Sequence, residues 1–303
     1  MKIIPLNYGA VEISDFDITK ISLSDIDFVK KVLGEELVVV IKKQNINPYH
    51  YARLIYHIGG LCNWGQCDRD IEGNLLSYKP ENIDIEHWDQ SKPFPVQRVT
   101  GEKRNGEFTG IFPLGKLDWH CNLNGPDRAD GVALQAIKGV EGTRTSWNNT
   151  ALALKNIPDD LKERIKGKYA KFYYNPIKWA DIDNQSQLQF MLQKREHYTM
   201  WLEQTNFAGI KGLYLYTNND CEIVGDDKNL FADLQDFLFQ EKFIYHHDWE
   251  IGDIVLSDQL LSLHKRRQES NEIFEKRLLN RITFRLTNLG NPPALMSRNK
   301  IYV

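Results

Sequence analysis

The sequence lacks any long apolar run. None of its 303 residues belongs to a stretch of eighteen or more apolar side chains, which is about the length that a membrane-spanning helix needs. The N-terminal stretch is basic and briefly apolar, but Pro5, Glu12 and Asp15 interrupt it too early for a secretory signal peptide. From these absences we expect a cytoplasmic protein that does not associate with membranes.

Cysteines and basic clusters are also scarce. The four cysteines Cys62, Cys67, Cys121 and Cys221 are too scattered for a disulfide scaffold. The first two have no second Cys/His pair at zinc-ligand spacing, so no zinc site is expected. The net charge is −3, and the one dense basic segment, Lys265–Arg267, is too short for nucleic-acid binding. Neither G-x-G-x-x-G nor a Walker sequence occurs, which argues against dinucleotide and P-loop chemistry.

Capping signals and periodicity predict helices early in the chain. Ser24 is the expected N-cap of a first helix that ends near Gly34. The β-branched run Glu36–Ile41 is typical of a buried strand. Pro48 is expected to open a second helix, which the pair Gly59-Gly60 ends.

The rest of the chain is predicted to consist mainly of strands. Asn105-Gly106 predicts a type I′ turn in a hairpin over Val96–Phe112. Helices are expected over Asn184–Gln204 and Asp226–Lys242. Further strands are expected over Asp130–Lys138, Lys168–Tyr174, Leu213–Tyr216, Lys242–His247, Asp253–Ser257 and Arg281–Thr287. This pattern favours a β-rich α+β barrel or jelly roll with helices packed outside, and it does not fit a doubly wound sheet.

No internal repeat, low-complexity tract or Pro/Gly/Ser linker divides the chain. We therefore expect a single domain over residues 1–303. Its N-terminal part of helices and strands is expected over 1–95, its β core over about 96–290, and a helical insertion over about 176–242.

Two distant histidines are candidates for metal binding. His120 stands two residues before Asn122, and residues i and i+2 of a strand point to the same side. Two imidazoles and a carboxylate on one face leave open positions on a non-haem ferrous ion, and the distant His264 supplies the second imidazole. Arg277, further along, is suited to bind the far carboxylate of a keto-acid cosubstrate through its guanidinium fork. Spacing alone, however, is more typical of ordinary structural histidines and exposed arginines.

The order of several motifs favours the metal site. They are the strand Glu36–Ile41 with its following helix, Trp119-His120-x-Asn122, Glu141–Asn148, Trp249–Asp258 followed by His264, and the pair Arg277 and Arg281. From about residue 22 onward the chain resembles the taurine dioxygenase/clavaminate synthase-like family of Fe(II)/2-oxoglutarate-dependent oxygenases. The last four match that family's W-H-x-D, G-G-x-T-x-W-x-N, W-x-x-G-D-x-x-x-x-D-N and R-x-x-x-R patterns. The resemblance implies a double-stranded β-helix, or jelly roll, with flanking helices.

The resemblance also implies a role for each matching residue. His120, Asn122 and His264 would be the catalytic iron ligands, Thr145 and Arg277 would bind the 2-oxoglutarate carboxylate, and Arg281 would help the cosubstrate or an anionic group of the substrate. The cofactors would be Fe(II), 2-oxoglutarate and O2. The expected function is dioxygenase chemistry, namely hydroxylation of a small polar or anionic molecule. A homo-oligomer is possible, and no nucleic-acid or membrane partner is expected.

Asn122 departs from the family pattern, which has Asp or Glu at this position. An amide oxygen can coordinate iron but brings no negative charge to the dication. Three hypotheses follow. Asn122 ligates and the protein is an oxygenase; the position is left to water or halide, as in halogenating members of the family; or the chain is a non-catalytic binding protein on the same fold. Asp118, two residues before His120, is a candidate for a substitute ligand.

Overall fold

The computed structural model describes residues 1–61, 68–69, 84–121, 129–173, 197–215, 221–225 and 229–286. Asn122 lies outside these described residues, as do Cys62, Cys67 and the first part of the helix expected over Asn184–Gln204. No helix among the described residues is both long and apolar enough to cross a membrane.

The N-terminal segment forms β1 (Lys2–Pro5), β2 (Ala10–Ser14), α1 (Leu23–Glu36), β3 (Val38–Ile41) and α2 (Pro48–Gly59). The second helix begins and ends where the sequence predicts. The first helix does not, because its N-cap is Ser22 rather than Ser24. Ser22 and Asp25 exchange side-chain and backbone hydrogen bonds as a capping box.

Gly34 does not end α1 either. Leu37 ends it in a left-handed conformation with φ 65°, and Gly34 lies inside the helix. A Cβ atom on Gly34 would stand 2.6 Å from the Cβ of Ala208. The glycine therefore serves the close packing of residues 207–208 on the helix rather than its termination.

A large sheet forms the centre of the molecule. Its order is β1-β2-β3-β17-β9-β19-β5-β4. All neighbours run antiparallel except β2 and β3. Its remaining strands are β4 (Asp68–Arg69), β5 (Val96–Val99), β9 (Gly131–Lys138), β17 (Ile254–Asp258) and β19 (Leu278–Phe284).

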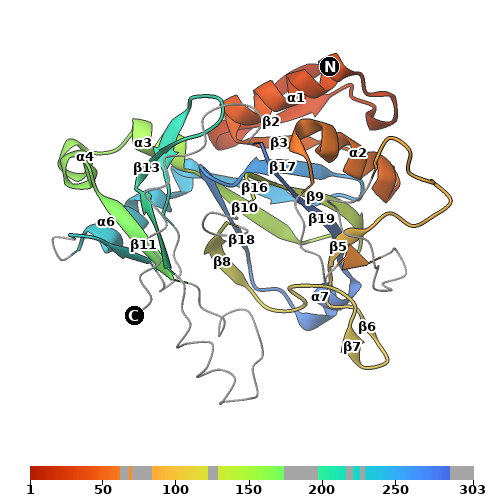
Figure 1. Ribbon diagram of the computed structural model, residues 1–303. Helices are drawn as coiled ribbons and strands as arrows, with labels where there is room; N and C mark the ends of the chain where they lie inside the picture. The colour runs from red at the N-terminus through yellow and green to blue at the C-terminus, as the bar shows by residue number, and fades with distance from the viewer. Residues whose placement is uncertain are drawn as a thin grey trace.

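A second, antiparallel sheet has the order β16-β10-β18-β8. Its strands are β8 (Leu117–His120), β10 (Arg144–Asn149), β16 (Ile244–Asp248) and β18 (Ser262–Arg266). The short helix α7 (Asn271–Lys276) leads into β19. Figure 1 shows α1 and α2 over one face of the large sheet and the second sheet beneath the opposite face.

The alternation of side chains along the strands explains this layering. Val39 and Ile41 of β3 belong to the core that faces α1 and α2, whereas Val38 and Val40 belong to the core between the two sheets. A strand buried on both faces needs an unbroken apolar run, which is what the segment Val38–Ile41 provides.

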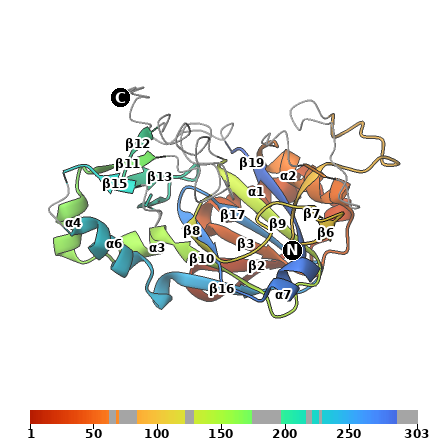
Figure 2. The same cartoon turned by 90° about the horizontal axis from the view of Figure 1, so that it is seen from below.

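A third group of elements packs beside the sheets. It contains α3 (Thr150–Lys155), α4 (Asp159–Ile165), α6 (Leu230–Leu238), β11 (Tyr169–Tyr173), β12 (His197–Trp201), β13 (Glu203–Thr205), β14 (Lys211–Leu213) and β15 (Cys221–Ile223). We call this group the lateral lobe. Figures 1 and 2 both show it to one side of the two sheets. Its own apolar core includes Phe172, Met200 and Leu234.

The strands β12 and β13 contradict the helix expected over Asn184–Gln204. Residues 197–201 pair with β11, and residues 203–205 pair with β14. The prediction was wrong there because pairing with distant strands satisfies the backbone, which local periodicity does not reveal. The hairpin expected over Val96–Phe112 is confirmed only at its tip. Asn105 and Gly106 have the positive φ angles of a primed turn between β6 (Lys103–Arg104) and β7 (Glu107–Phe108).

Candidate active site

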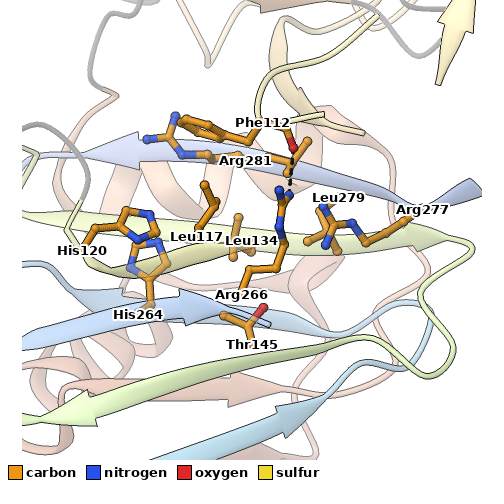
Figure 3. Close-up of a pocket in the computed structure, with 11 residues that line it drawn as sticks. Phe112, Leu117, His120, Leu134, Thr145, His264, Arg266, Arg277, Leu279 and Arg281 are labelled. Carbon is orange, nitrogen blue, oxygen red and sulfur yellow. Dashed lines mark hydrogen bonds between the residues drawn. The ribbon is translucent and has the colours of Figure 1, made fainter. Parts of the chain in front are cut away.

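A pocket lies between the two sheets (Figure 3). It holds about 430 Å³ of empty space, counting the part that opens to solvent. The residues that line it are Val99, Phe112, Leu117, His120, Leu134, Thr145, His264, Arg266, Arg277, Leu279 and Arg281. They come from β5, β8, β9, β10, β18 and β19 and from the segments before β8 and β19.

Strand register brings the polar residues together. His264 on β18 stands directly opposite His120 on β8, and Arg266 stands opposite Thr145 on β10. Paired residues of antiparallel strands point to the same face, and so do residues i and i+2 of one strand. His120, His264, Thr145 and Arg266 therefore share the face that is turned towards the large sheet. From that sheet Arg277, Leu279 and Arg281 extend back at the same two-residue spacing.

The two histidine rings adjoin each other. Their centroids are 4.2 Å apart, and both side chains are buried. The Nδ1 atom of His120 is 2.7 Å from the carbonyl oxygen of Asp118. Because a carbonyl can only accept, Nδ1 carries the proton and Nε2 keeps its lone pair. A backbone carbonyl commonly orients metal-binding histidines in this way.

Burial keeps both imidazoles neutral. It lowers the pKa of His120 to about 4, and it lowers the pKa of His264 well below its usual value. The nearby guanidinium of Arg281 acts in the same direction on both. Neutral imidazole is the form that binds metal ions, so the pair is ready to coordinate without losing a proton.

Arg277 lies deep in the pocket without a full set of partners. Its side chain is buried and stacks on Phe274 at 5.0 Å. Within the described ranges, its Nε and one terminal nitrogen have no hydrogen-bond partner. Burial lowers the pKa of Arg277 to about 10, which leaves the group charged at neutral pH. A buried guanidinium with unused donors suits a carboxylate ligand.

The pocket is positively charged. Arg281 donates a short hydrogen bond to the buried amide oxygen of Gln97, which stands opposite it on β5. Arg266 and Arg277 are the other two guanidinium groups, and no aspartate or glutamate is among the described residues that line the pocket. Figure 3 shows Arg266 and Arg277 on the side away from the two imidazoles, whereas Arg281 extends above the rings. Such a pocket favours anionic ligands.

Arg266 is a pocket residue that sequence reasoning missed. The basic run Lys265–Arg267 is typical of a solvated turn, but the Arg266 side chain is only 5% exposed. Its three guanidinium nitrogens donate to the carbonyl oxygens of Phe112, Leu114 and Gly115 at 2.8–2.9 Å. The two-residue spacing from His264 is the signal that indicates its orientation.

Five of the six residues assigned to the site by the sequence line this one pocket. They are His120, His264, Thr145, Arg277 and Arg281. Asn122 lies outside the described residues. No group of three or more possible His, Cys, Asp or Glu ligands occurs in the described part of the chain. Asp118 is not brought to the pocket, because its side chain is 66% exposed and pairs with Lys116.

A pair of neutral imidazoles and a facing guanidinium with unused donors have the chemistry that suits a metal ion and an anionic ligand. The residues present therefore fit a non-haem iron and a dicarboxylate such as 2-oxoglutarate. This combination is typical of β-rich, metal-dependent oxygenases.

Comparison with known proteins also indicates a metal-dependent oxygenase. The family model described as taurine catabolism dioxygenase TauD, TfdA family matches residues 2–283. The alpha-ketoglutarate-dependent 2,4-dichlorophenoxyacetate dioxygenase of Burkholderia sp. (strain RASC) is 25% identical over 253 residues, which cover 80% of each chain. Among solved structures, AAD-2 in complex with Mn(II) and N-oxalylglycine has a TM-score of 0.67 at 17% identity, covering 97% of this chain and 99% of that chain. A taurine dioxygenase from Burkholderia xenovorans has a TM-score of 0.66 at 17% identity, covering 98% and 92%.

The chain therefore belongs to the TauD/TfdA family of dioxygenases. It is a non-haem iron dioxygenase whose cofactors are Fe(II), 2-oxoglutarate and O2, and its fold is β-rich with several sheets and some helices.

Proposed function

We propose that this enzyme hydroxylates a small polar or anionic molecule, with His120, His264 and Asn122 as the iron ligands. Thr145 and Arg277 bind the distal carboxylate of 2-oxoglutarate, and Arg281 assists the cosubstrate or an anionic group of the substrate. We also propose that the two facing sheets are the halves of a double-stranded β-helix in a single domain.

The single observation that carries the proposal is the arrangement of the buried guanidinium of Arg277 in one pocket with the imidazole pair. Within the described ranges two guanidinium nitrogens of Arg277 have no hydrogen-bond partner, and the Asp118 carbonyl orients the His120 ring by accepting from its Nδ1. Bound together, iron and 2-oxoglutarate would supply oxidative chemistry in which O2 gives one oxygen atom to succinate, released with CO2, and the other to the hydroxylated substrate. The chain itself supplies orientation and, through Val99, Leu134 and Leu279, an apolar wall that limits water.

The substrate class is supported by charge. The described lining holds three guanidinium groups and no acidic side chain, so a cationic substrate would be repelled. Arg266 is engaged by three carbonyl oxygens. With Arg277 assigned to the cosubstrate, we assign Arg281, which also bonds Gln97, to an anionic group of the substrate.

The test is succinate release from 2-oxoglutarate under air by the iron-loaded enzyme, with candidate anionic substrates. Product masses from reactions that contain chloride or bromide separate hydroxylation from halogenation. We expect hydroxylated product and succinate together. Absence of both bound iron and succinate would instead support a binding protein on the same fold.

The variant Arg277→Met tests the assignment of the cosubstrate site. Methionine keeps an apolar side chain against Phe274 but removes the charged donors. We expect the KM for 2-oxoglutarate to rise on the order of 10- to 100-fold, because charged hydrogen bonds of this kind contribute about 1.5–3 kcal/mol. The matched control is Arg267→Met, a half-exposed arginine that bonds Glu269 and the Gly142 carbonyl outside the pocket. Equal effects in both variants would refute the assignment.

A further inference from the structure

The Trp249 indole donates a hydrogen bond to the Thr145 hydroxyl. The indole Nε1 lies 2.9 Å from the Thr145 Oγ1 atom, and both side chains are buried. An indole N–H can donate but cannot accept, so the hydroxyl oxygen must be the acceptor. This bond therefore fixes the direction of the threonine: one lone pair is engaged, and the hydroxyl proton must point elsewhere.

The Thr145 hydroxyl can donate this proton to a ligand in the pocket. Thr145 lines it, and among the described residues its hydroxyl makes no other hydrogen bond. Arg277 lines the same pocket and also offers only donors. An ionised carboxylate, which only accepts, is the complement of this pair.

Trp249 is itself held firmly and at a distance from the ligand. It is not among the residues that line the pocket. Its backbone N–H donates to the Thr143 carbonyl at 3.2 Å. Its ring packs edge-on against His247 at 4.6 Å and against Trp147 at 6.2 Å. The indole N–H can therefore act on the ligand only through Thr145.

We propose that Trp249 is a positioning residue for the cosubstrate: by donating to Thr145, it makes that hydroxyl a one-way donor to the distal carboxylate of 2-oxoglutarate. The inference rests on the proposed role of Thr145. It adds a residue that touches neither iron nor cosubstrate. Trp249 instead determines that the Thr145 hydroxyl donates to the cosubstrate.

The experiment is calorimetric titration of the metal-loaded enzyme in the absence of O2. The two probes are 2-oxoglutarate and 2-oxopentanoate. The second has the same number of carbon atoms but carries a methyl group in place of the distal carboxylate. For Trp249→Phe we expect about tenfold weaker binding of 2-oxoglutarate and less than about twofold change for 2-oxopentanoate. A packing defect would weaken both ligands alike and would overturn the proposal.

Thr145 variants complete the test. Thr145→Val should weaken 2-oxoglutarate by a similar factor, and adding Trp249→Phe to it should cost nothing further, because both changes remove one coupled unit. Thr145→Ser keeps the hydroxyl and should bind 2-oxoglutarate nearly as tightly as the native enzyme. Full additivity in the double variant would contradict the inference.

Two controls guard the interpretation. Trp201→Phe removes an indole from the lateral lobe, where Trp201 packs against Tyr169, and should leave both affinities unchanged. If Trp249→Phe lowers the melting temperature too far, Trp249→benzothienylalanine keeps the ring shape and removes only the N–H donor. Failure of Thr145→Val to weaken 2-oxoglutarate would refute the proposed site. Weakening by Thr145→Val but not by the Trp249 variants would refute this inference alone.

Discussion

At the position where the family pattern has a carboxylate, this chain carries Asn122, next to the buried Cys121 and two residues beyond His120. The Cys121 side chain belongs to the core of the lateral lobe and contacts the Tyr214 hydroxyl at 3.4 Å, so it faces away from the pocket, as strand alternation predicts. As a ligand, an amide at position 122 would bring no negative charge to the iron.

Replacing this amide by a carboxylate should therefore tighten iron binding. For Asn122→Asp we expect the affinity for Fe(II), measured by titration under argon, to rise on the order of tenfold or more, since opposite charges in contact attract strongly. The control Asn124→Asp adds the same charge two residues further along. Unchanged affinity in Asn122→Asp would remove residue 122 from the ligand set, and equal gains in both variants would indicate only a general charge effect.

The residues of the site differ in how well the sequence predicts them. His120, His264 and Arg277 belong to ordered motifs, and the structure brings all three to one pocket. Trp249 also belongs to a motif, but its contact with Thr145 depends on the distance between β10 and the end of β16, which spacing along the chain does not give. Arg266 belongs to no motif, and the basic run Lys265–Arg267 is more typical of a solvated turn than of a pocket wall.

At the scale of elements, Arg266 ties β18 to the segment that leads into β8. That segment contains two residues with positive φ, Phe112 at 49° and Gly115 at 77°. A left-handed phenylalanine is strained and persists only where its surroundings determine it. The three bonds from Arg266 supply that constraint, and the Phe274 ring stacks on the guanidinium at 4.6 Å.

We expect Arg266→Lys to loosen this wall of the pocket. A lysine ammonium cannot reproduce the planar fork that meets three carbonyl oxygens, so the free energy of unfolding should fall by about 2–4 kcal/mol. Amide hydrogen exchange across residues 112–117 should accelerate. Arg267→Lys, at the neighbouring half-exposed position, is the control. If exchange in this segment is the same in both variants, Arg266 does not hold the wall.

Elements themselves are predictable where local chemistry dominates. Pro48 and Gly59-Gly60 bound α2 because first-turn proline and terminal glycine act locally. The strands β12 and β13 are not predictable in this way, because their hydrogen bonds go to β11 and β14 rather than to neighbours in sequence. The start of α1 is hard to predict for a related reason. Ser22 and Ser24 are both suitable N-cap residues, and only the reciprocal hydrogen bonds with Asp25 identify Ser22 as the N-cap.

At the scale of the whole molecule, Asp258 joins the large sheet to α1 and to residues beside the lateral lobe. Its carboxylate accepts from the backbone N–H groups of Leu260 and Leu261 at 2.7 Å and from the Asn206 amide at 3.3 Å. Asn206 in turn donates to the Gly34 carbonyl at 2.8 Å. Burial outweighs these bonds and raises the pKa of Asp258 from 3.8 to about 6.

This shift predicts a pH dependence of stability. Between about pH 4 and pH 6 the folded protein keeps a proton on Asp258 that the unfolded chain has released. The stabilisation is therefore fully present below the unfolded pKa and is lost as the pH rises through 6. The difference from 3.8 to about 6 corresponds to about 3 kcal/mol. Relative to the native protein, Asp258→Asn should gain up to this amount as the pH rises from 4 to 6, measured by urea unfolding.

The comparison uses differences between proteins because burial of His120 and His264 acts with the opposite sign in an overlapping pH range. Asp248→Asn is the control. Hydrogen bonds from Arg144 lower the pKa of Asp248, so its contribution should change only below about pH 4. A difference between Asp258→Asn and the native protein that stays flat from pH 4 to 6 would contradict the role of Asp258.

The position of β8 has one more consequence. Among the described strands, β8 lies at the edge of the second sheet and pairs there with β18 alone. If the two imidazoles bind iron as proposed, the ion cross-links β8 and β18 through two residues that are 144 positions apart in the sequence. Iron would then favour the closed pairing by mass action, since it binds only when β8 is in place. Without the metal, β8 would be the first strand of the site to lose its pairing. Iron occupancy of the site and the order of β8 would therefore increase or decrease together.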